Sequence, residues 1–178
     1  MGGRRLLRIE SRGQGEEVSS LMCRRLIAPN ESMTLCYEVF MRTITKITVD
    51  WADVDAMRHV NNLALLRYIQ SARVNICHAA GVMPEYVSPK IGPIVAQIDV
   101  RFIKPLFFPG EVTIESRVTG CREHSFTLSH RVMNADGDVV AEENEVMVYY
   151  DYEAGRKLPL PDAFVNAVGA DEQPEKNA

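Results

Sequence analysis

Ionisable side chains gather in one short stretch directly ahead of a helix-patterned run. Asp53 and Asp55 come first, His59 follows four positions after Asp55, and the pair Asn61-Asn62 closes the stretch. Carboxylates and imidazoles accept and donate protons, and the free backbone N–H groups in the first turn of a helix can hold a negatively charged oxygen. The spacing therefore predicts a proton-handling site in a loop at a helix N-terminus.

A helix that follows this loop is expected over residues 62–80. Apolar residues recur there at helical spacing, as in Leu66 and Ile69, which predicts one buried face. Asn61 is the expected N-cap because its side chain can accept a hydrogen bond from an unpaired backbone N–H. Gly81 is the expected stop at the other end.

Alternation of apolar and polar residues predicts five strands. They cover about residues 35–51, 94–102, 112–119, 124–133 and 139–151. Asp136-Gly137 is a strong hairpin signal between the last two. Because no crossover helix fits between the second and fifth strands, we expect those four to form an antiparallel meander. A short helix is expected over residues 163–168.

Size and composition limit the classes of function. The chain has 178 residues, of which 46% are hydrophobic and 25% charged, as in a globular protein with one domain. The formal net charge of -4 argues against a nucleic-acid partner, because such proteins usually carry a basic excess. No apolar run approaches the ~20 residues that span a bilayer, so no membrane partner is expected. The four cysteines include no C-x-x-C pair, which argues against a zinc site and favours reduced thiols in the cytoplasm.

The chain divides into three parts by composition. Residues 1–32 hold six arginines and four glutamates without strand or helix periodicity, so we expect a disordered or non-core extension there. An upstream start codon, with Met33 or Met41 as the true start, is another interpretation of that stretch. Residues 33–169 are expected to form a single domain, and residues 170–178 a disordered polar tail.

The loop and the helix together carry a family resemblance. The run DVDAMRHVNNLALLRYIQSAR resembles the hotdog-fold thioesterases of the 4-hydroxybenzoyl-CoA thioesterase and YbgC-like group, with their pattern W-x-D-x-D-x-x-x-H-V-N-N. It is also similar to the plant acyl-carrier-protein thioesterases. Through VAQIDVRFIKPLFFPGEV and LPLPDAF the resemblance covers about residues 37–168. It implies an α+β hotdog fold, a curved antiparallel sheet around one long central helix. A single sheet covers one side of such a helix, so a homodimer or homotetramer is expected.

The resemblance also implies an activity and roles for the loop. The activity is hydrolysis of an acyl-CoA thioester, or of an acyl carrier protein thioester, with no metal or bound cofactor. Asp55 is then the general base or nucleophile; without the motif it is a solvated or capping aspartate. His59 either orients water and the substrate carbonyl or only packs in the loop. Asn61 is first a cap, with a lesser catalytic share, and the backbone N–H groups of Asn62 and Leu63 form the oxyanion hole.

Residues outside the loop are candidates for holding the substrate. Asp53 is expected to be structural, in an Asx-type turn. Gln97, on the second strand, is a candidate from the second subunit. Arg101, Lys104 and Arg131 are candidate contacts for the phosphates of coenzyme A, although each one alone is also explained as solvated surface charge.

Two other functions remain open. A hotdog hydratase resembles D-x-N-P-x-H, with the histidine five positions after the acid; here His59 comes four positions after Asp55 and no proline intervenes, which disfavours it. A non-catalytic acyl-binding or regulatory module on the same fold is the second alternative, and the atypical Met57 and Arg58 of the loop keep it open.

Overall fold

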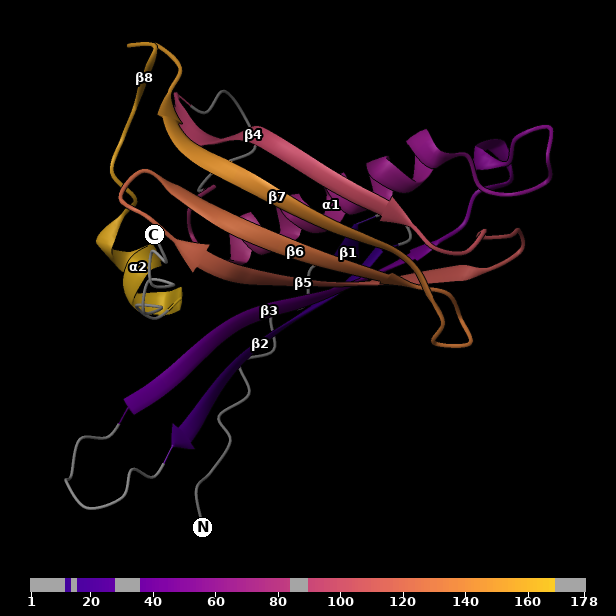
Figure 1. The fold of residues 1–178 in the computed structure, drawn as a ribbon, viewed down its shortest axis with the longest axis horizontal. Helices are drawn as coiled ribbons and strands as arrows, with labels where there is room; N and C mark the ends of the chain where they lie inside the picture. The colour runs from indigo at the N-terminus through magenta and orange to yellow at the C-terminus, as the bar shows by residue number, and fades with distance from the viewer. Residues whose placement is uncertain (1–11, 14–15, 28–35, 84–89, 169–178) are drawn as a thin grey trace, which may run out of the picture.

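The structure is a computed structural model that describes residues 12–13, 16–27, 36–83 and 90–168, with side chains from Met41 onward. One antiparallel sheet forms the body of the molecule, and a long helix runs across one of its faces (Figure 1). The expected tail over residues 170–178 lies outside the described residues. None of the described helices is both long and apolar enough to cross a membrane.

The sheet has the strand order β1-β2-β3-β5-β6-β7-β4, with β8 paired to β7. Its strands are β1 (Arg12–Gly13), β2 (Glu16–Ile27), β3 (Cys36–Thr48), β4 (Ile91–Phe102), β5 (Glu111–Cys121), β6 (Ser125–Met133), β7 (Val139–Asp151) and β8 (Arg156–Lys157). The five expected strands correspond to β3 through β7. The turn between β6 and β7 is confirmed at Gly137, which has φ +83° and donates its N–H to Asn134 O at 3.0 Å.

The expected meander is only half right. Strands β5, β6 and β7 follow one another as antiparallel neighbours. The second expected strand, β4, instead pairs with β7 at the edge of the sheet, and β3 takes the place beside β5. Alternation identifies which residues share a face, but it does not identify the neighbouring strand. Here Pro105 and Pro109 interrupt the β4–β5 connection, so these two strands do not form a tight hairpin.

The N-terminal extension contains a regular element that the sequence analysis did not predict. Strand β2 pairs with β3 along its whole length, from Glu16 opposite Ile47 to Ile27 opposite Cys36. The end of this hairpin at which β2 ends and β3 begins projects beyond the rest of the sheet (Figure 1). Main-chain pairing does not require alternating side chains, so the absence of periodicity in residues 1–32 did not exclude a strand. That residues 1–32 lie outside the core stays a prediction.

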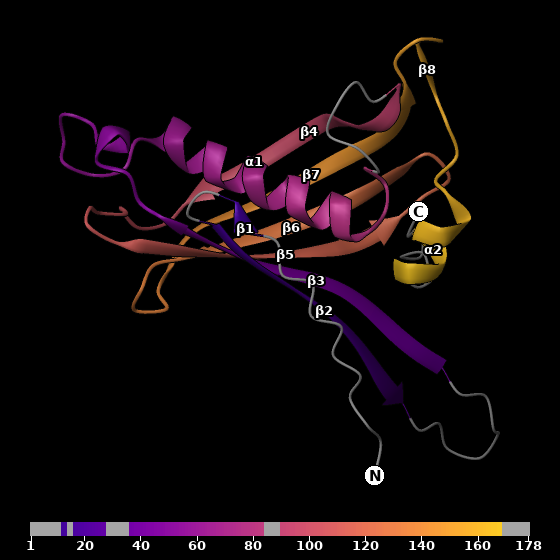
Figure 2. The same ribbon diagram turned by 180° about the vertical axis from the view of Figure 1, so that it is seen from behind.

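Helix α1 (Asn62–Ala79) begins and ends where the sequence predicts. Asn61 Oδ1 accepts from Leu63 N at 2.8 Å, and Gly81 follows with φ +74°, a conformation that costs glycine little. The helix lies over β3 and β5 (Figure 2). A second helix, α2 (Asp162–Val168), packs Phe164 against Phe126 of β6, with ring centroids 4.9 Å apart.

The core beneath α1 has two apolar clusters with a polar layer between them. The first surrounds the N-terminal half of α1 and includes Leu65, Ile69 and Leu106; the second surrounds its C-terminal half and includes Ile76 and Phe126. The layer between them, here called the polar belt, consists of Thr43, Thr45, Arg73, Asn75, Ser116, His130, Glu143 and Glu145. Four of these residues stand directly opposite one another on β3, β5, β6 and β7: Thr43, Ser116, His130 and Glu143.

Candidate active site

The loop between β3 and α1 is a short hairpin. Val54 and Val60 form an isolated antiparallel bridge at its base. Beyond them, Asp55 N donates to His59 O at 3.0 Å and Arg58 N donates to Asp55 O at 2.9 Å. Arg58 has φ +65°, which is uncommon for a residue with a Cβ. The hairpin thus brings the predicted acid and the predicted histidine to the two sides of one tight turn.

The side chains of Asp55 and His59 face each other at this turn. Asp55 Oδ1 accepts from Met57 N at 2.8 Å, and Asp55 Oδ2 lies 3.4 Å from His59 Nδ1. The same Nδ1 lies 3.3 Å from Val60 O. Because both neighbours of Nδ1 are acceptors, a neutral ring carries its proton there and presents the lone pair of Nε2. The two side chains are 25% and 39% exposed, so water and substrate can reach them.

Asp53 has a structural role of a different kind from the expected Asx turn. Its carboxylate accepts from Tyr68 Oη at 2.6 Å and pairs with Arg67 Nη2, both on α1. Its backbone oxygen accepts from Asn61 N at 2.9 Å. Burial, and then the Asp53 carboxylate, raise the pKa of Tyr68 to about 12, so the hydroxyl stays a proton donor. The Asx turns of this region instead belong to Asp50 and Asp55, whose side chains accept from the N–H two residues ahead.

The helix N-terminus offers fewer free donors than predicted. Leu63 N is already donated to Asn61 Oδ1, so an oxyanion must compete with the cap for this N–H. Asn61 therefore acts as the cap in this structure. Asn62 N has no hydrogen-bond acceptor among the described residues, which leaves it as the better donor of the predicted pair.

The predicted substrate-binding residues lie on β4, on β6 and directly after β4. Gln97 and Arg101 are exposed on β4. Arg101 stands opposite Glu142, which stands opposite Arg131 on β6; these side chains belong to the sheet face that α1 does not cover. Lys104 Nζ pairs with an Asp138 oxygen at 3.1 Å. Within the described part of the chain, no hydrogen bond or ion pair links any of the four to Asp55, and their role stays a prediction.

Comparison with known proteins identifies the family. Residues 49–168 match the model of the thioesterase-like superfamily. The chain belongs to this superfamily. The matched range contains the whole Asp55–His59 hairpin, α1 and the strands from β4 onward, and it confirms the family resemblance found in the sequence.

Individual relatives agree with this assignment. This superfamily member is 21% identical over 156 residues to an L-carnitine dehydrogenase/betainyl-CoA thioesterase of Agrobacterium fabrum (strain C58 / ATCC 33970), a match that covers 88% of this chain and 31% of the relative. The chain thus spans about a third of the length of that curated relative. Two solved structures are each 27% identical and each match 71% of this chain and 97% of their own. They are the PA2801 protein from Pseudomonas aeruginosa, with a TM-score of 0.66, and a thioesterase from Thermus thermophilus complexed with coenzyme A and Zn, with a TM-score of 0.61. They confirm the hotdog fold.

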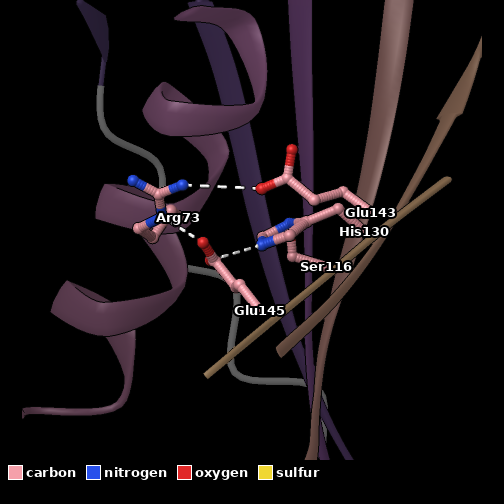
Figure 3. A network of polar contacts seen from close by, with 5 residues as sticks. All are labelled: Arg73, Ser116, His130, Glu143 and Glu145. Atoms are coloured by element: carbon pink, nitrogen blue, oxygen red, sulfur yellow. Dashed lines mark hydrogen bonds and ion pairs between the residues drawn. The ribbon is translucent and has the colours of Figure 1, made fainter. Parts of the chain in front are cut away.

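A second constellation, absent from the sequence-based predictions, lies in the polar belt of this thioesterase-like chain (Figure 3). His130 Nδ1 is 2.8 Å from Ser116 Oγ, and His130 Nε2 is 2.9 Å from Glu145 Oε1. Arg73 Nε donates to Glu145 Oε2 at 2.6 Å, and Arg73 Nη2 lies 3.5 Å from Glu143 Oε1. The available signal was the pair of glutamates at alternate positions of β7, on the face that elsewhere carries Ala141 and Met147.

The line of Ser116, His130 and Glu145 in the belt is closed to solvent, which decides what it can do. Ser116 and His130 are 0% exposed and Glu145 is 2% exposed. Burial, and then the neighbouring Glu145, raise the pKa of Glu143 to about 7. Burial acts in the same direction on Glu145, but the hydrogen bonds from His130 and Arg73 outweigh it and hold its pKa below the ordinary value. A serine, a histidine and a glutamate in line are the residue types of a hydrolase triad, yet no substrate reaches this one, and we interpret it as structural.

Proposed function

We propose that the chain is a thioester hydrolase that acts on acyl-CoA. The observation that carries the proposal is the Asp55–His59 pair at the tip of a hairpin whose far end is the N-cap of α1. A carboxylate, an imidazole and a free backbone N–H in one small region are the groups that acyl transfer requires. The coenzyme A bound to the Thermus thermophilus thioesterase and the betainyl-CoA thioesterase activity in the name of the Agrobacterium relative support a coenzyme A thioester as substrate.

Asp55 acts on the thioester carbonyl in one of two ways. As a general base, its carboxylate takes a proton from water while the water oxygen attacks the carbonyl carbon. As a nucleophile, it attacks directly, expels the thiolate and forms a mixed anhydride that water then hydrolyses. In both routes the carbonyl oxygen becomes negative, and Asn62 N–H at the positive end of α1 stabilises it. The C–S bond breaks and the thiolate takes a proton. In the general-base route this is the proton that Asp55 took from the water, which the neighbouring His59 can relay; in the nucleophile route it comes from the water that hydrolyses the anhydride.

The proposal includes a second copy of the chain. Strand β4 is an edge of the sheet. Exposed apolar side chains lie on it and in the segment directly after it: Ile94, Ile98, Phe102, Ile103, Phe107 and Phe108. Unpaired edges and large apolar patches mark interaction sites. A homodimer or homotetramer would cover these side chains and let the pantetheine arm pass between subunits, with Gln97 contributed by the partner. Arg101, Lys104 and Arg131 would meet the phosphates, and reduced thiols would agree with a cytoplasmic location.

The test is steady-state hydrolysis of a panel of short, long and aromatic acyl-CoAs, followed by the release of free thiol. We expect turnover on at least one class and none with Asp55→Asn. Tight binding of an acyl-CoA without thiol release would favour the acyl-binding module over the enzyme. The same panel presented on an acyl carrier protein separates the two thiol carriers.

A further inference from the structure

Helix α1 holds the hairpin that carries Asp55 by a contact that no catalytic motif describes. Tyr68, one residue past Arg67 on the second turn of the helix, donates its hydroxyl to Asp53 Oδ2 at 2.6 Å. Arg67 pairs with the other oxygen of the same carboxylate. Asp53 is therefore held on both oxygens, and its side chain is only 11% exposed.

This contact clamps the base of the hairpin. Asp53 stands immediately before Val54, which bridges to Val60, and its backbone oxygen accepts from Asn61 N at 2.9 Å. Asn61 is in turn the cap of α1. Both ends of the hairpin are thus tied to the helix, one through the Tyr68–Asp53 bond and the other through the cap. Only a few residues separate these two anchors from Asp55, so the position of Asp55 relative to α1 can vary little.

We propose that Tyr68 is a positioning residue: its hydroxyl, acting through Asp53, holds Asp55 and His59 at a set distance from the N-terminus of α1. The inference rests on the proposed hydrolase function and deepens it, because the base and the oxyanion donor belong to different elements and must meet at one carbonyl group. A displacement of about 1 Å in such a geometry can cost on the order of a hundredfold in rate.

Tyr68 is better suited to this role than Arg67. The ring of Tyr68 is only 7% exposed and packs in the first apolar cluster, so few conformations are open to it. The Arg67 side chain is 65% exposed, where water competes for the guanidinium and such pairs contribute little. Because the pKa of the Tyr68 hydroxyl is about 12, the hydroxyl keeps its proton at neutral pH and the bond to Asp53 persists.

The decisive variant is Tyr68→Phe, which removes one hydroxyl and keeps the buried ring. We expect kcat to fall about tenfold while KM stays within about twofold, since the bond orients the catalytic groups rather than the substrate. Tyr152→Phe is the matched control: its hydroxyl also donates to an acceptor, Pro93 O at 3.1 Å. Tyr152 lies in the turn between β7 and β8, at the opposite end of the sheet from the β3–α1 loop that carries Asp55 (Figures 1 and 2). Its loss should leave kcat unchanged.

A second readout does not depend on turnover. Trp51 is the only tryptophan of the sequence. It lies in the short helix η1 (Trp51–Asp53), which ends at the residue that Tyr68 contacts. Time-resolved fluorescence anisotropy of Trp51 should show more fast local motion in Tyr68→Phe than in the wild type or in Tyr152→Phe. In the background Asp53→Ala, the change Tyr68→Phe should have no further effect on kcat or on the anisotropy, because the two groups act as one contact.

The outcomes separate the two proposals. If the wild type hydrolyses thioesters and Tyr68→Phe matches it in kcat and in Trp51 motion, the positioning role is wrong and the hydrolase function stands. Additive effects of Tyr68→Phe and Asp53→Ala would also overturn the role, since Tyr68 would then act by another path. If the wild type hydrolyses no thioester, the proposed function fails, and the role of Tyr68 in turnover fails with it.

Discussion

His130 Nε2 lies 2.9 Å from Glu145 Oε1 beneath α1, and neither side chain is open to solvent. Arg73 reaches the other oxygen of the same carboxylate from the helix. The pair therefore joins β6, β7 and α1 at one point between two apolar clusters. Apolar contacts are not directional, whereas this arrangement satisfies its charges in one register of the helix on the sheet. We infer that the polar belt fixes that register.

Replacement of Arg73 tests the belt. Arg73→Leu removes the cation that faces both Glu143 and Glu145. Glu143 then loses its contact with Arg73, and Glu145 keeps only His130. We expect the free energy of unfolding to fall by about 3–5 kcal/mol, as for other broken buried ion pairs. Urea denaturation measures it, with Arg156→Leu on the exposed strand β8 as the control, for which a change below about 0.5 kcal/mol is expected. Equal stability of the two variants would show that the belt does not hold the helix.

The pH dependence of stability should carry the signature of Glu143. Its pKa is raised from 4.5 to about 7, so between these values the folded state keeps a proton that the unfolded state releases. The contribution of Glu143 to the free energy of unfolding is therefore fully present below about pH 4.5 and is lost as the pH rises through about 7. Glu143→Gln cannot lose that proton. We expect the difference in free energy of unfolding between the variant and the wild type to grow by about 2 kcal/mol in favour of the variant from pH 5 to pH 8. Urea denaturation at a series of pH values measures it. A difference that does not change with pH would contradict the assignment.

Asp55→Asn should abolish most turnover and leave the fold intact. The change keeps the size of the side chain but removes the negative charge that both mechanisms require. We expect kcat to fall about 10²–10⁴-fold, with a melting temperature close to that of the wild type. Asp136→Asn, in the exposed β6–β7 turn, is the matched control. His59→Ala should cost less than Asp55→Asn, because its role is orientation and proton supply. Near-normal turnover in Asp55→Asn would show that this carboxylate does no chemistry.

The chain should be at least a homodimer in solution. The open edge of β4 and the apolar side chains along it need a cover, and a permanent interface typically buries more than about 2,000 Å². Light scattering at micromolar concentration measures the mass. Ile98→Asp, at a position 47% exposed on that edge, should shift the mass toward the monomer, whereas Ala154→Asp in the exposed turn after β7 should not. A fully active monomer near 20.0 kDa would disprove the dimer.

Removal of residues 1–32 should leave the fold and the activity largely intact. The family match covers residues 49–168 and includes none of residues 1–32. The cost is a newly exposed edge on β3, which has lost β2. Melting temperature and turnover of the full and shortened chains test this. A large drop in both would show that β2 completes the core or the pocket.

Local features of this protein could be predicted from the sequence. The cap at Asn61, the stop at Gly81 and the turn at Gly137 all depend on neighbours within a few residues, so the residue types alone indicate them. The Asp55–His59 pair was found for the same reason, since both residues lie in one short loop. The alternation on β3 through β7 also placed these strands within a few residues of their observed bounds.

Contacts between distant residues were decided only by the tertiary structure. The place of β4 beside β7, the pairing of β2 with β3, and the ion pair of Arg73 with Glu145 each join parts of the chain that no local pattern relates. Even Tyr68 and Asp53, which are close in sequence, meet only because the loop folds back along α1. Periodicity states which face a side chain occupies, but the partner on that face depends on the packing of the whole sheet against the helix.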